Sequence, residues 1–568
     1  MRNWLADVLG WATFLLVSVF AACLAWETGF LPEHVRLPLW PYQLLLVLAG
    51  AFQLAALILR NDPWRISRQR RHYPIAFSAA AAIVSLAVLL WLSDEHVARR
   101  IIYVLLAIET LSSMASRISL VLRLRLRPQM ILAVSFLAVI ILGTLALLMP
   151  NSTTRGISLI NALFTSVSAV CVTGLTVVDT ATAFTMLGKV IILCLIQVGG
   201  LGIVMISYLL ISLVRMNISI QEKIHLREFF TGDSRAPLAR ALKTVLFMVI
   251  GIELVSAGSL YLAWQNEFPQ GQAAVYAVFH AVSAFCNAGF SLFPQGYENP
   301  VAKGNAWIVS ITGLTIFLGS VGFLTQYDVL ALIKARWQRR RYRLSVSSRI
   351  VLTSSFILVL SAAFLFWLGE RNNALAGLPA GDVILHSFFQ SVTLRTAGFS
   401  TLNFAAFAPA TLLFMLFFMF IGGASISTAG GVKINTVVAT LLAVRMTLKA
   451  DRAMNLGGRR IPFAAVNKAL AILFSATVVL AMAILLLAVT EPVLARNNLV
   501  ALVFEAFSAL GTVGLSTGIT AELTDYSKLI LSAEMFVGRI GPMTLALLLT
   551  RPERFTDYEF PDEDLTVG

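Results

Sequence analysis

Charged side chains and long polar stretches are scarce in this sequence. Of its 568 residues, 58% are hydrophobic and 13% are charged, and the mean hydropathy is +0.83. A large water-soluble domain would need a long stretch of ordinary polarity, and the chain contains none. The composition therefore excludes such a domain and is typical of a polytopic membrane protein.

Residues that carry catalysis or bind metals are also few. The cysteines form no CxxC pair and lie in apolar surroundings, so we expect them to be small buried hydrophobic residues. They are Cys23, Cys171, Cys194 and Cys286. The six histidines are scattered and lack metal-ligand spacing. A membrane enzyme is the rival interpretation, but it would need clustered His, Asp or Glu within the spans.

The net charge of +14 comes from basic residues that gather in alternate loops, around residues 60–71, 117–127 and 334–349. The loops between them carry far fewer basic residues. This alternation is the positive-inside pattern, which places the basic loops in the cytoplasm beside anionic lipid headgroups. The charge therefore indicates topology and membrane lipids as partners, and no nucleic acid.

The apolar windows predict how often the chain crosses the membrane. A helix needs about 20 apolar residues to cross the hydrocarbon core. Twelve windows qualify: 9–27, 41–60, 74–93, 99–116, 129–149, 185–214, 241–264, 307–332, 348–368, 409–446, 464–490 and 527–550. An even number of crossings puts both termini on one side, and the basic loops make that side cytoplasmic. We expect a multi-pass protein of the plasma (cell inner) membrane.

Four short apolar segments lie between the last eight crossings, and each ends at a glycine. They read FTSVSAVCVTGLT (164–176), FHAVSAFCNAGFS (279–291), FFQSVTLRTAGFS (388–400) and FEAFSALGTVGLS (504–516). Each has an aromatic residue ten positions before its glycine and a large apolar residue, then Ser or Thr, after it. The glycines are 115, 109 and 116 residues apart: Gly174, Gly289, Gly398 and Gly514. This regular spacing predicts four copies of one unit.

Each unit is a helix, a half-span and a second helix, so all four units share one orientation. Parallel repeats of this kind arrange around an axis along the membrane normal. We predict an all-α polytopic membrane protein with four parallel helix–pore-loop–helix repeats around a central pore. The predicted divisions are extra N-terminal transmembrane helices at 1–126 and repeats at 127–236, 237–343, 344–460 and 461–568.

Four converging loops would present rings of backbone carbonyls, which can replace the hydration shell of a monovalent cation. Glycine lets the carbonyls approach the axis without a Cβ in the way. No carboxylate stands at these positions, which disfavours a divalent-cation site. The predicted filter for a monovalent cation is Val172, Thr173, Gly174, Leu175, Asn287, Ala288, Gly289, Phe290, Thr396, Ala397, Gly398, Phe399, Thr512, Val513, Gly514 and Leu515.

Two arginines lie within predicted membrane segments. We expect Arg395 to point behind the filter and brace carbonyls, because facing the axis it would repel the ion. Arg539 lies midway along the last span, where a charge must find acceptors; the alternative is an arginine that snorkels to the interface. The glycine-rich break at 422–431 supplies acceptors and predicts a gating loop inside the third repeat. The predicted gate is Gly422, Gly423, Ser425, Ser427, Thr428, Gly430, Gly431 and Arg539.

Five segments together resemble the Trk/Ktr/HKT superfamily of potassium transporters, most closely its KtrB-type (TrkH/KtrB) potassium-translocating subunits. They are TSVSAVCVTGLTVVD (165–179), IQVGGLGIV (196–204), QSVTLRTAGFSTLNF (390–404), MFIGGASISTAGGVKINT (419–436) and MFVGRIGPMTLALLL (535–549). The resemblance implies passive K⁺ movement through one pore in each protomer of a homodimer. It also implies a cytosolic nucleotide-binding (RCK-type) ring that opens the pore. This sequence has no GxxxxGK[ST] motif, so nucleotide would act through a separate protein.

The resemblance implies K⁺ as the bound and transported ion, with Na⁺ as the alternative, and no organic cofactor. Two features depart from the family. Its members commonly have GGSPGSTAGG where this chain has GGASISTAGG (422–431), and residues 1–126 are extra. We expect these helices to serve as a scaffold or docking site, because the arginines at 117–127 lack the spacing of a voltage sensor. A Na⁺-permeable variant and a membrane sensor are the alternatives.

Overall fold

The computed structural model describes residues 27–30, 128–202, 238–449, 455–456, 459–542 and 544. The predicted N-terminal helices and the C-terminal tail lie almost wholly outside this range, as does the basic loop at 203–237. Within the described part the chain is helical apart from one hairpin of β1 (Asn455–Leu456) and β2 (Arg459–Arg460). The prediction of an all-α membrane protein is confirmed at this level.

The helices fall into four groups in chain order. Each group starts with a helix of 20 to 28 residues. A helix of 12 to 16 residues, called the short helix below, then leads into the glycine loop of the group. The first group is α5 (Pro128–Leu147), η2 (Pro150–Ser152), α6 (Leu159–Val170), α7 (Thr180–Ala183) and α8 (Met186–Leu201). The second is α11 (Leu238–Trp264), α12 (Gln270–Phe285), η3 (Gly296–Glu298), α13 (Pro300–Lys303), α14 (Ala306–Val321) and α15 (Phe323–Trp337).

The third and fourth groups follow the same order. The third is α16 (Val346–Glu370), α17 (Ala380–Thr393), η4 (Phe404–Ala406), α18 (Pro409–Phe420) and α19 (Ile434–Lys449). The fourth is α20 (Phe463–Thr490), α21 (Pro492–Asn497), α22 (Leu499–Gly511), η5 (Thr520–Glu522) and α23 (Asp525–Ile540). The short helices begin at polar caps or prolines; Ser158, for example, accepts a hydrogen bond from the Asn161 N–H.

Three described helices are long and apolar enough to cross a membrane: Thr244–Trp264 within α11, Val346–Glu370 and Phe463–Thr490. They match the predicted crossings at 241–264, 348–368 and 464–490. The crossing predicted at 307–332 is wrong as one straight helix, because α14 and α15 meet at Gly322 with a bend of 102°. The crossing predicted at 409–446 is also interrupted, by the loop at 421–433 between α18 and α19.

Glycines with positive φ end three of the helices that follow the short ones. They are Gly202 after α8 (φ 76°), Gly322 after α14 (φ 88°) and Gly541 after α23 (φ 96°). Positive φ is open to glycine at little steric expense and cannot continue a right-handed helix. The crossings predicted at 185–214 and 527–550 are therefore broken at these points, and most of their remaining residues lie outside the described range.

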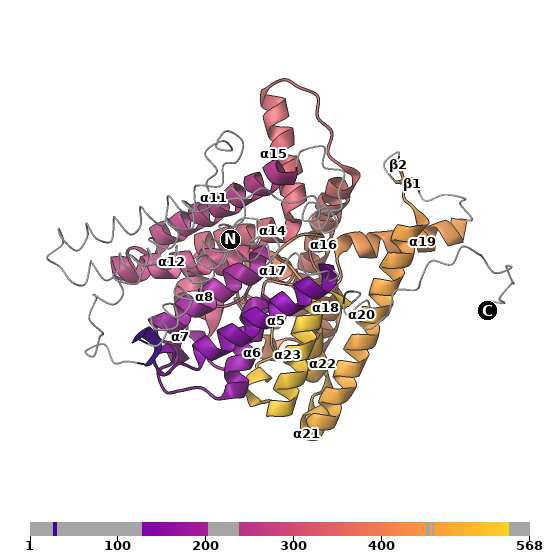
Figure 1. Ribbon diagram of the computed structural model, residues 1–568. Coiled ribbons are helices and arrows are strands. Elements are labelled where there is room, and N and C mark those ends of the chain that lie inside the picture. The colour runs from indigo at the N-terminus through magenta and orange to yellow at the C-terminus, as the bar shows by residue number, and fades with distance from the viewer. Residues whose placement is uncertain are drawn as a thin grey trace, which may run out of the picture.

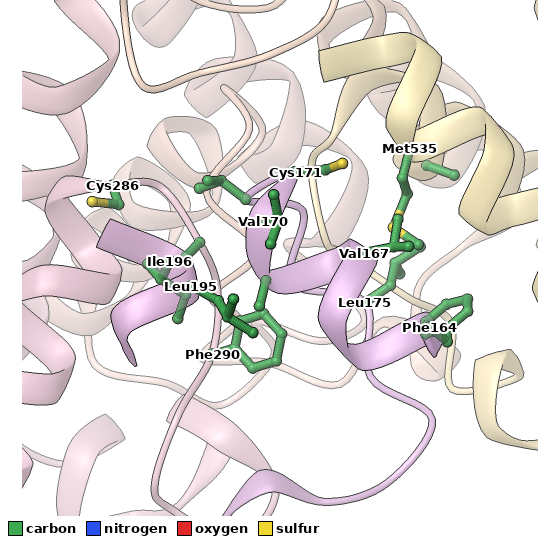
Figure 2. Packing of buried hydrophobic residues seen from close by; sticks show 14 of the residues in the cluster. Phe164, Val167, Val170, Cys171, Leu175, Leu195, Ile196, Cys286, Phe290 and Met535 are labelled. Carbon is green, nitrogen blue, oxygen red and sulfur yellow. The ribbon is translucent and has the colours of Figure 1, made fainter. Parts of the chain in front are cut away.

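The short helices are buried in the middle of the molecule, whereas the long ones expose apolar side chains. Phe164, Phe285 and Phe504 on short helices are fully buried, while Phe247, Phe474 and Val489 on long helices are exposed. The first and last groups meet, since α6 packs against α23 (Figure 1). Figure 2 shows Phe164 and Val167 of α6 close to Met535 of α23 in one buried cluster. The four groups thus close around a centre.

The cysteine prediction is wrong at one described position. Cys171 and Cys286 are buried, but Cys194 on α8 is exposed. Its helix turns one face outward, where an apolar thiol meets lipid as readily as it meets a protein core. Cys23 lies outside the described residues.

Candidate functional site

The loops that follow α6, α12, α17 and α22 share one backbone conformation. In each loop the glycine and the residue two positions before it have positive φ. The pairs are Val172 and Gly174 (58° and 95°), Asn287 and Gly289 (59° and 70°), Thr396 and Gly398 (64° and 75°), and Thr512 and Gly514 (48° and 85°). When the sign of φ alternates from residue to residue, successive peptide planes turn so that their carbonyls face the same side.

Three of these positive-φ residues, Val172, Thr396 and Thr512, are β-branched, which makes the conformation a genuine outlier. A left-handed residue with a side chain is disfavoured by roughly 1–2 kcal/mol. Such strain persists only where the surroundings hold it, and it clusters at functional sites. The sequence predicted the glycines but not this second strained position, because the residue types found there do not indicate a positive φ.

The four glycines touch one another in order. A Cβ on Gly174 would lie 2.5 Å from the Ala288 oxygen, and one on Gly289 would lie 2.9 Å from the Ala397 oxygen. One on Gly398 would lie 3.0 Å from the Val513 oxygen. A Cβ on Gly514 would collide with the Thr173 oxygen, which closes the ring. Backbone therefore surrounds the centre on all sides, and a side chain at any of the four glycines would crowd a carbonyl oxygen.

The last turn of each short helix holds the loop after it. The Thr173, Ala288 and Val513 N–H groups donate to carbonyls five residues earlier, at 2.8, 2.7 and 2.8 Å. In the third loop the Ala397 N–H instead donates to the Thr393 oxygen, four residues earlier, at 3.0 Å. The third helix is thus joined to its loop differently from the other three.

A cavity of about 330 Å³ opens onto one end of the ring and is lined by all four glycines and by the residues two positions after them. Two carboxylates, Asp179 and Glu298, also line this vestibule. Partial burial raises the pKa of Glu298, against the opposing effect of Lys303. Acidic groups at the mouth of a cleft raise the local concentration of cations.

The loop at 421–433 lies at the other end of the ring. The Thr428 hydroxyl is 3.4 Å from the Asn287 side-chain oxygen, and a Cβ on Gly430 would collide with the Thr512 hydroxyl. Both contacts reach a residue two positions before a filter glycine, Asn287 or Thr512. These two residues lie on the side of the ring away from the vestibule. The structure therefore brings the predicted filter and the predicted gating loop into contact.

Backbone hydrogen bonds fix the path of this loop. The Gly422 N–H donates to the Val432 oxygen at 2.9 Å, closing the loop on itself. The Ala424 N–H donates to the Ser320 oxygen at 3.0 Å, and the Phe323 N–H donates to the Ile426 oxygen at 2.9 Å. The loop is thus anchored where α14 bends into α15. Of the predicted gate residues, Ser427 bonds within the loop and Ser425 is exposed.

Two partly buried cations bind consecutive carbonyls of the loop. Arg539 donates to the Thr428 oxygen and also to the oxygens of Gly199 and Gly200 on α8. Lys433 donates to the oxygens of Ala429 and Gly430. The sequence analysis missed Lys433, although a lysine beside a glycine-rich break in an apolar segment was a signal that could have found it. Cations that are partly shielded from water need hydrogen-bond acceptors, and the free loop carbonyls provide them.

Arg395 does not brace carbonyls, contrary to prediction. It is 2% exposed, and its three side-chain nitrogens have no hydrogen-bond partner among the described residues. Its guanidinium carbon lies 5.9 Å from the centre of the Phe317 ring, close enough for a cation–π contact. The backbone oxygen of Arg395, rather than its side chain, accepts a hydrogen bond from Asn287 at 3.2 Å.

Comparison with known proteins places this geometry in context. The sequence profile of the TrkH family, described as a cation transport protein, matches residues 95–555. The Ktr system potassium uptake protein B of Bacillus subtilis is 35% identical over 447 residues, which cover 78% of this chain and 97% of the relative. The potassium/sodium uptake protein NtpJ of Enterococcus hirae is 33% identical over 451 residues, covering 78% and 98%.

A solved structure shares the fold. The crystal structure of the potassium transporter TrkH from Vibrio parahaemolyticus superposes with a TM-score of 0.60 at 19% identity. The match covers 89% of this chain and 97% of that one.

Proposed function

Because this chain belongs to the TrkH family of cation transport proteins, we propose that it is a potassium uptake protein whose path runs through the ring of four glycine loops. Members of the family are transporters rather than enzymes, and the chain is a multi-pass helical membrane protein. The finer points that follow are part of the proposal.

The observation that carries the proposal is the closed ring of backbone oxygens. The oxygens of Thr173, Ala288, Ala397 and Val513 each lie against the glycine of the neighbouring loop. Such a ring can replace the water around a monovalent cation, and it contains no carboxylate that would favour a divalent one. The residues named above as the filter serve as the K⁺ filter in the proposal. The four repeats and their boundaries at 127, 237, 344 and 461 belong to it as well.

The loop at 421–433 is proposed as the gate. It lies across the end of the ring opposite the vestibule, and Arg539 and Lys433 bind its carbonyls. Because both cations approach the inner end of the path, the closed loop also opposes cation entry by charge. Opening then requires moving the loop away from Arg539 and Lys433.

A separate cytosolic nucleotide-binding ring on a homodimer is the proposed source of that movement. Supporting it are basic residues in the last turn of α15 and just after it, at a projecting corner of the molecule (Figure 1). The exposed ones include Lys334, Arg336, Arg339 and Arg340. We expect affinity purification of the full-length protein to recover a soluble nucleotide-binding partner. Recovery of none, with flux indifferent to ATP and ADP, would contradict this part of the proposal.

Ion flux into liposomes containing the purified protein tests the function directly. We expect K⁺ flux to exceed Na⁺ flux clearly, with protein-free liposomes as the control. Equal K⁺ and Na⁺ flux would favour the second candidate, a potassium/sodium carrier like the named Enterococcus relative. No flux of either ion, from protein that is folded by size-exclusion chromatography, would refute the proposal.

A further inference from the structure

A hydroxyl from the last turn of each short helix also contacts the loop that follows, and it does so in two ways. In the first and fourth loops the hydroxyl is an acceptor. Ser168 accepts a hydrogen bond from the Gly174 N–H at 3.0 Å, and Ser508 accepts one from the Gly514 N–H at 3.0 Å. These contacts hold the glycine and leave the next carbonyl untouched.

In the second and third loops the hydroxyl is a donor. Ser283 donates to the Phe290 oxygen at 2.8 Å, and Thr393 donates to the Phe399 oxygen at 2.6 Å. Both oxygens belong to the residue directly after the glycine. The hydrogen bonds therefore turn these two carbonyls toward their own helices and away from the axis.

The corresponding oxygens of the other two loops are free. Those of Leu175 and Leu515 accept no hydrogen bond within the described ranges. The side chains follow the same division, because the tied carbonyls belong to phenylalanines and the free ones to leucines. Figure 2 shows Phe290 packed against Leu195 and Ile196 of α8. The Phe399 ring lies 4.9 Å from that of Tyr297, so packing and hydrogen bond together hold each tied residue.

We propose that the outermost ring of the filter offers a cation two carbonyl oxygens instead of four, and that Ser283 and Thr393 set this number. The inference rests on the proposed K⁺ path. Two residues earlier in each loop, the oxygens of Thr173, Ala288, Ala397 and Val513 accept no hydrogen bond from described residues, so all four are available. An ion that enters from the vestibule thus meets a half-complete ring first and keeps part of its water there.

Ser283→Ala and Thr393→Val test this inference, with Ser168→Ala and Ser508→Ala as matched controls. The first pair releases a carbonyl that can turn toward the ion, whereas the second pair removes an acceptor from a glycine N–H. We expect the apparent KM for external K⁺ in liposome flux to fall about two- to tenfold in the first pair, the range expected for gaining one oxygen contact. The controls should show no fall in KM, and Ser283→Thr and Thr393→Ser should keep the wild-type KM.

An unchanged or higher KM in Ser283→Ala and Thr393→Val would overturn the inference, as would an equal fall in all four variants. Each variant is compared at equal amounts of protein folded by size-exclusion chromatography. If a single variant does not fold, the other of its pair carries the same test, because both hydroxyls donate to the oxygen of the residue directly after the glycine. Failure of the wild-type protein to move K⁺ would refute the proposed function instead, so the two failures are distinguishable.

Discussion

Gly174 has no room for a side chain, and its φ of 95° is one that side chains rarely adopt. These two constraints act differently. Positive φ strains the backbone of any residue with a Cβ. The contact with the Ala288 oxygen acts on the proposed filter itself, because that oxygen must move if a Cβ is added. A comparison of two glycines separates the effects.

We expect Gly174→Ser to lower the K⁺/Na⁺ permeability ratio about tenfold or more, which corresponds to ~1.4 kcal/mol of lost discrimination. The added Cβ would lie 2.5 Å from the Ala288 oxygen and would re-aim it. Gly518→Ser is the matched control, because Gly518 has the same φ of 95° but no atom within 4 Å of the position that a Cβ would take. A Gly174→Ser protein with the wild-type ratio in liposome flux would show that this loop is not the filter.

Arg539 joins α23, the last described helix, to the proposed gating loop at 421–433. Its guanidinium donates to the Thr428 oxygen on the loop and to the Gly199 and Gly200 oxygens on α8. A partly buried arginine held by carbonyls stabilises whichever position of the loop provides those acceptors. In this structure that position lies across the ring.

We expect Arg539→Ala to raise K⁺ flux in the absence of the activating partner, because it removes both the donors and the charge. Arg539→Gln keeps a shorter neutral donor and should give an intermediate flux if hydrogen bonding is what holds the loop. Flux is measured in liposomes at equal folded amounts. If neither variant is faster than wild type, Arg539 does not keep the path closed.

At the scale of elements, the loop at 421–433 replaces what the apolar pattern predicts as continuous helix. The four helices that follow the short ones carry small residues at matching positions. Gly199 and Gly202, Gly319 and Gly322, and Gly538 and Gly541 share one three-residue spacing, and the third group has Gly422 and Ser425. A Cβ on Gly199, Gly319 or Gly538 would collide with a carbonyl at the end of a short helix. In these three groups the first position requires glycine because it packs against a carbonyl of the short helix. The second position is glycine because the helix ends there with a positive φ.

Deleting residues 424–427 should raise K⁺ flux without the activating partner and reduce dependence on it. The deletion removes the bonds of Ala424 to Ser320 and of Ile426 to Phe323, so the loop loses its anchor at the bend between α14 and α15. Ser425→Ala is the control, because Ser425 is exposed and the substitution keeps the length of the loop. Wild-type flux in the deletion variant, at equal folded amounts, would show that this stretch does not block the path.

At the scale of the whole molecule, the four helix groups and the ring that they surround lie within residues 128–544. Residues 1–126 were predicted to be extra helices and lie almost wholly outside the described residues. A voltage sensor needs charge that moves within the membrane field. The arginines at 117–127 lack regular spacing and cluster at the predicted cytoplasmic end.

Removing residues 1–126 should therefore leave K⁺ flux and its dependence on membrane potential unchanged, if these helices are a scaffold or docking site. The measurement is flux at two imposed potentials, for the full chain and the truncated chain at equal folded amounts. A potential dependence present in the full chain and lost on truncation would favour the sensor interpretation.

The sequence by itself determined the class of the protein and the place of its central loops. Apolar composition, basic loops and a glycine repeat are local patterns, and each can be read without knowing what packs against what. They were enough to predict a helical membrane protein and to single out Gly174, Gly289, Gly398 and Gly514.

Only the tertiary structure decided how these loops meet. Val172, Asn287, Thr396 and Thr512 have positive φ because their surroundings impose it. Valine and threonine do not favour this conformation, so their presence in the sequence does not predict it; only asparagine adopts it more readily. The order of the ring, the isolation of Arg395 and the contacts of Lys433 depend on residues far apart in the chain. The hydrogen bonds of Ser283 and Thr393 could not be predicted from the sequence either. Four segments of one repeat orient their carbonyls in two ways, because the direction of a hydrogen bond depends on packing that the repeat does not record.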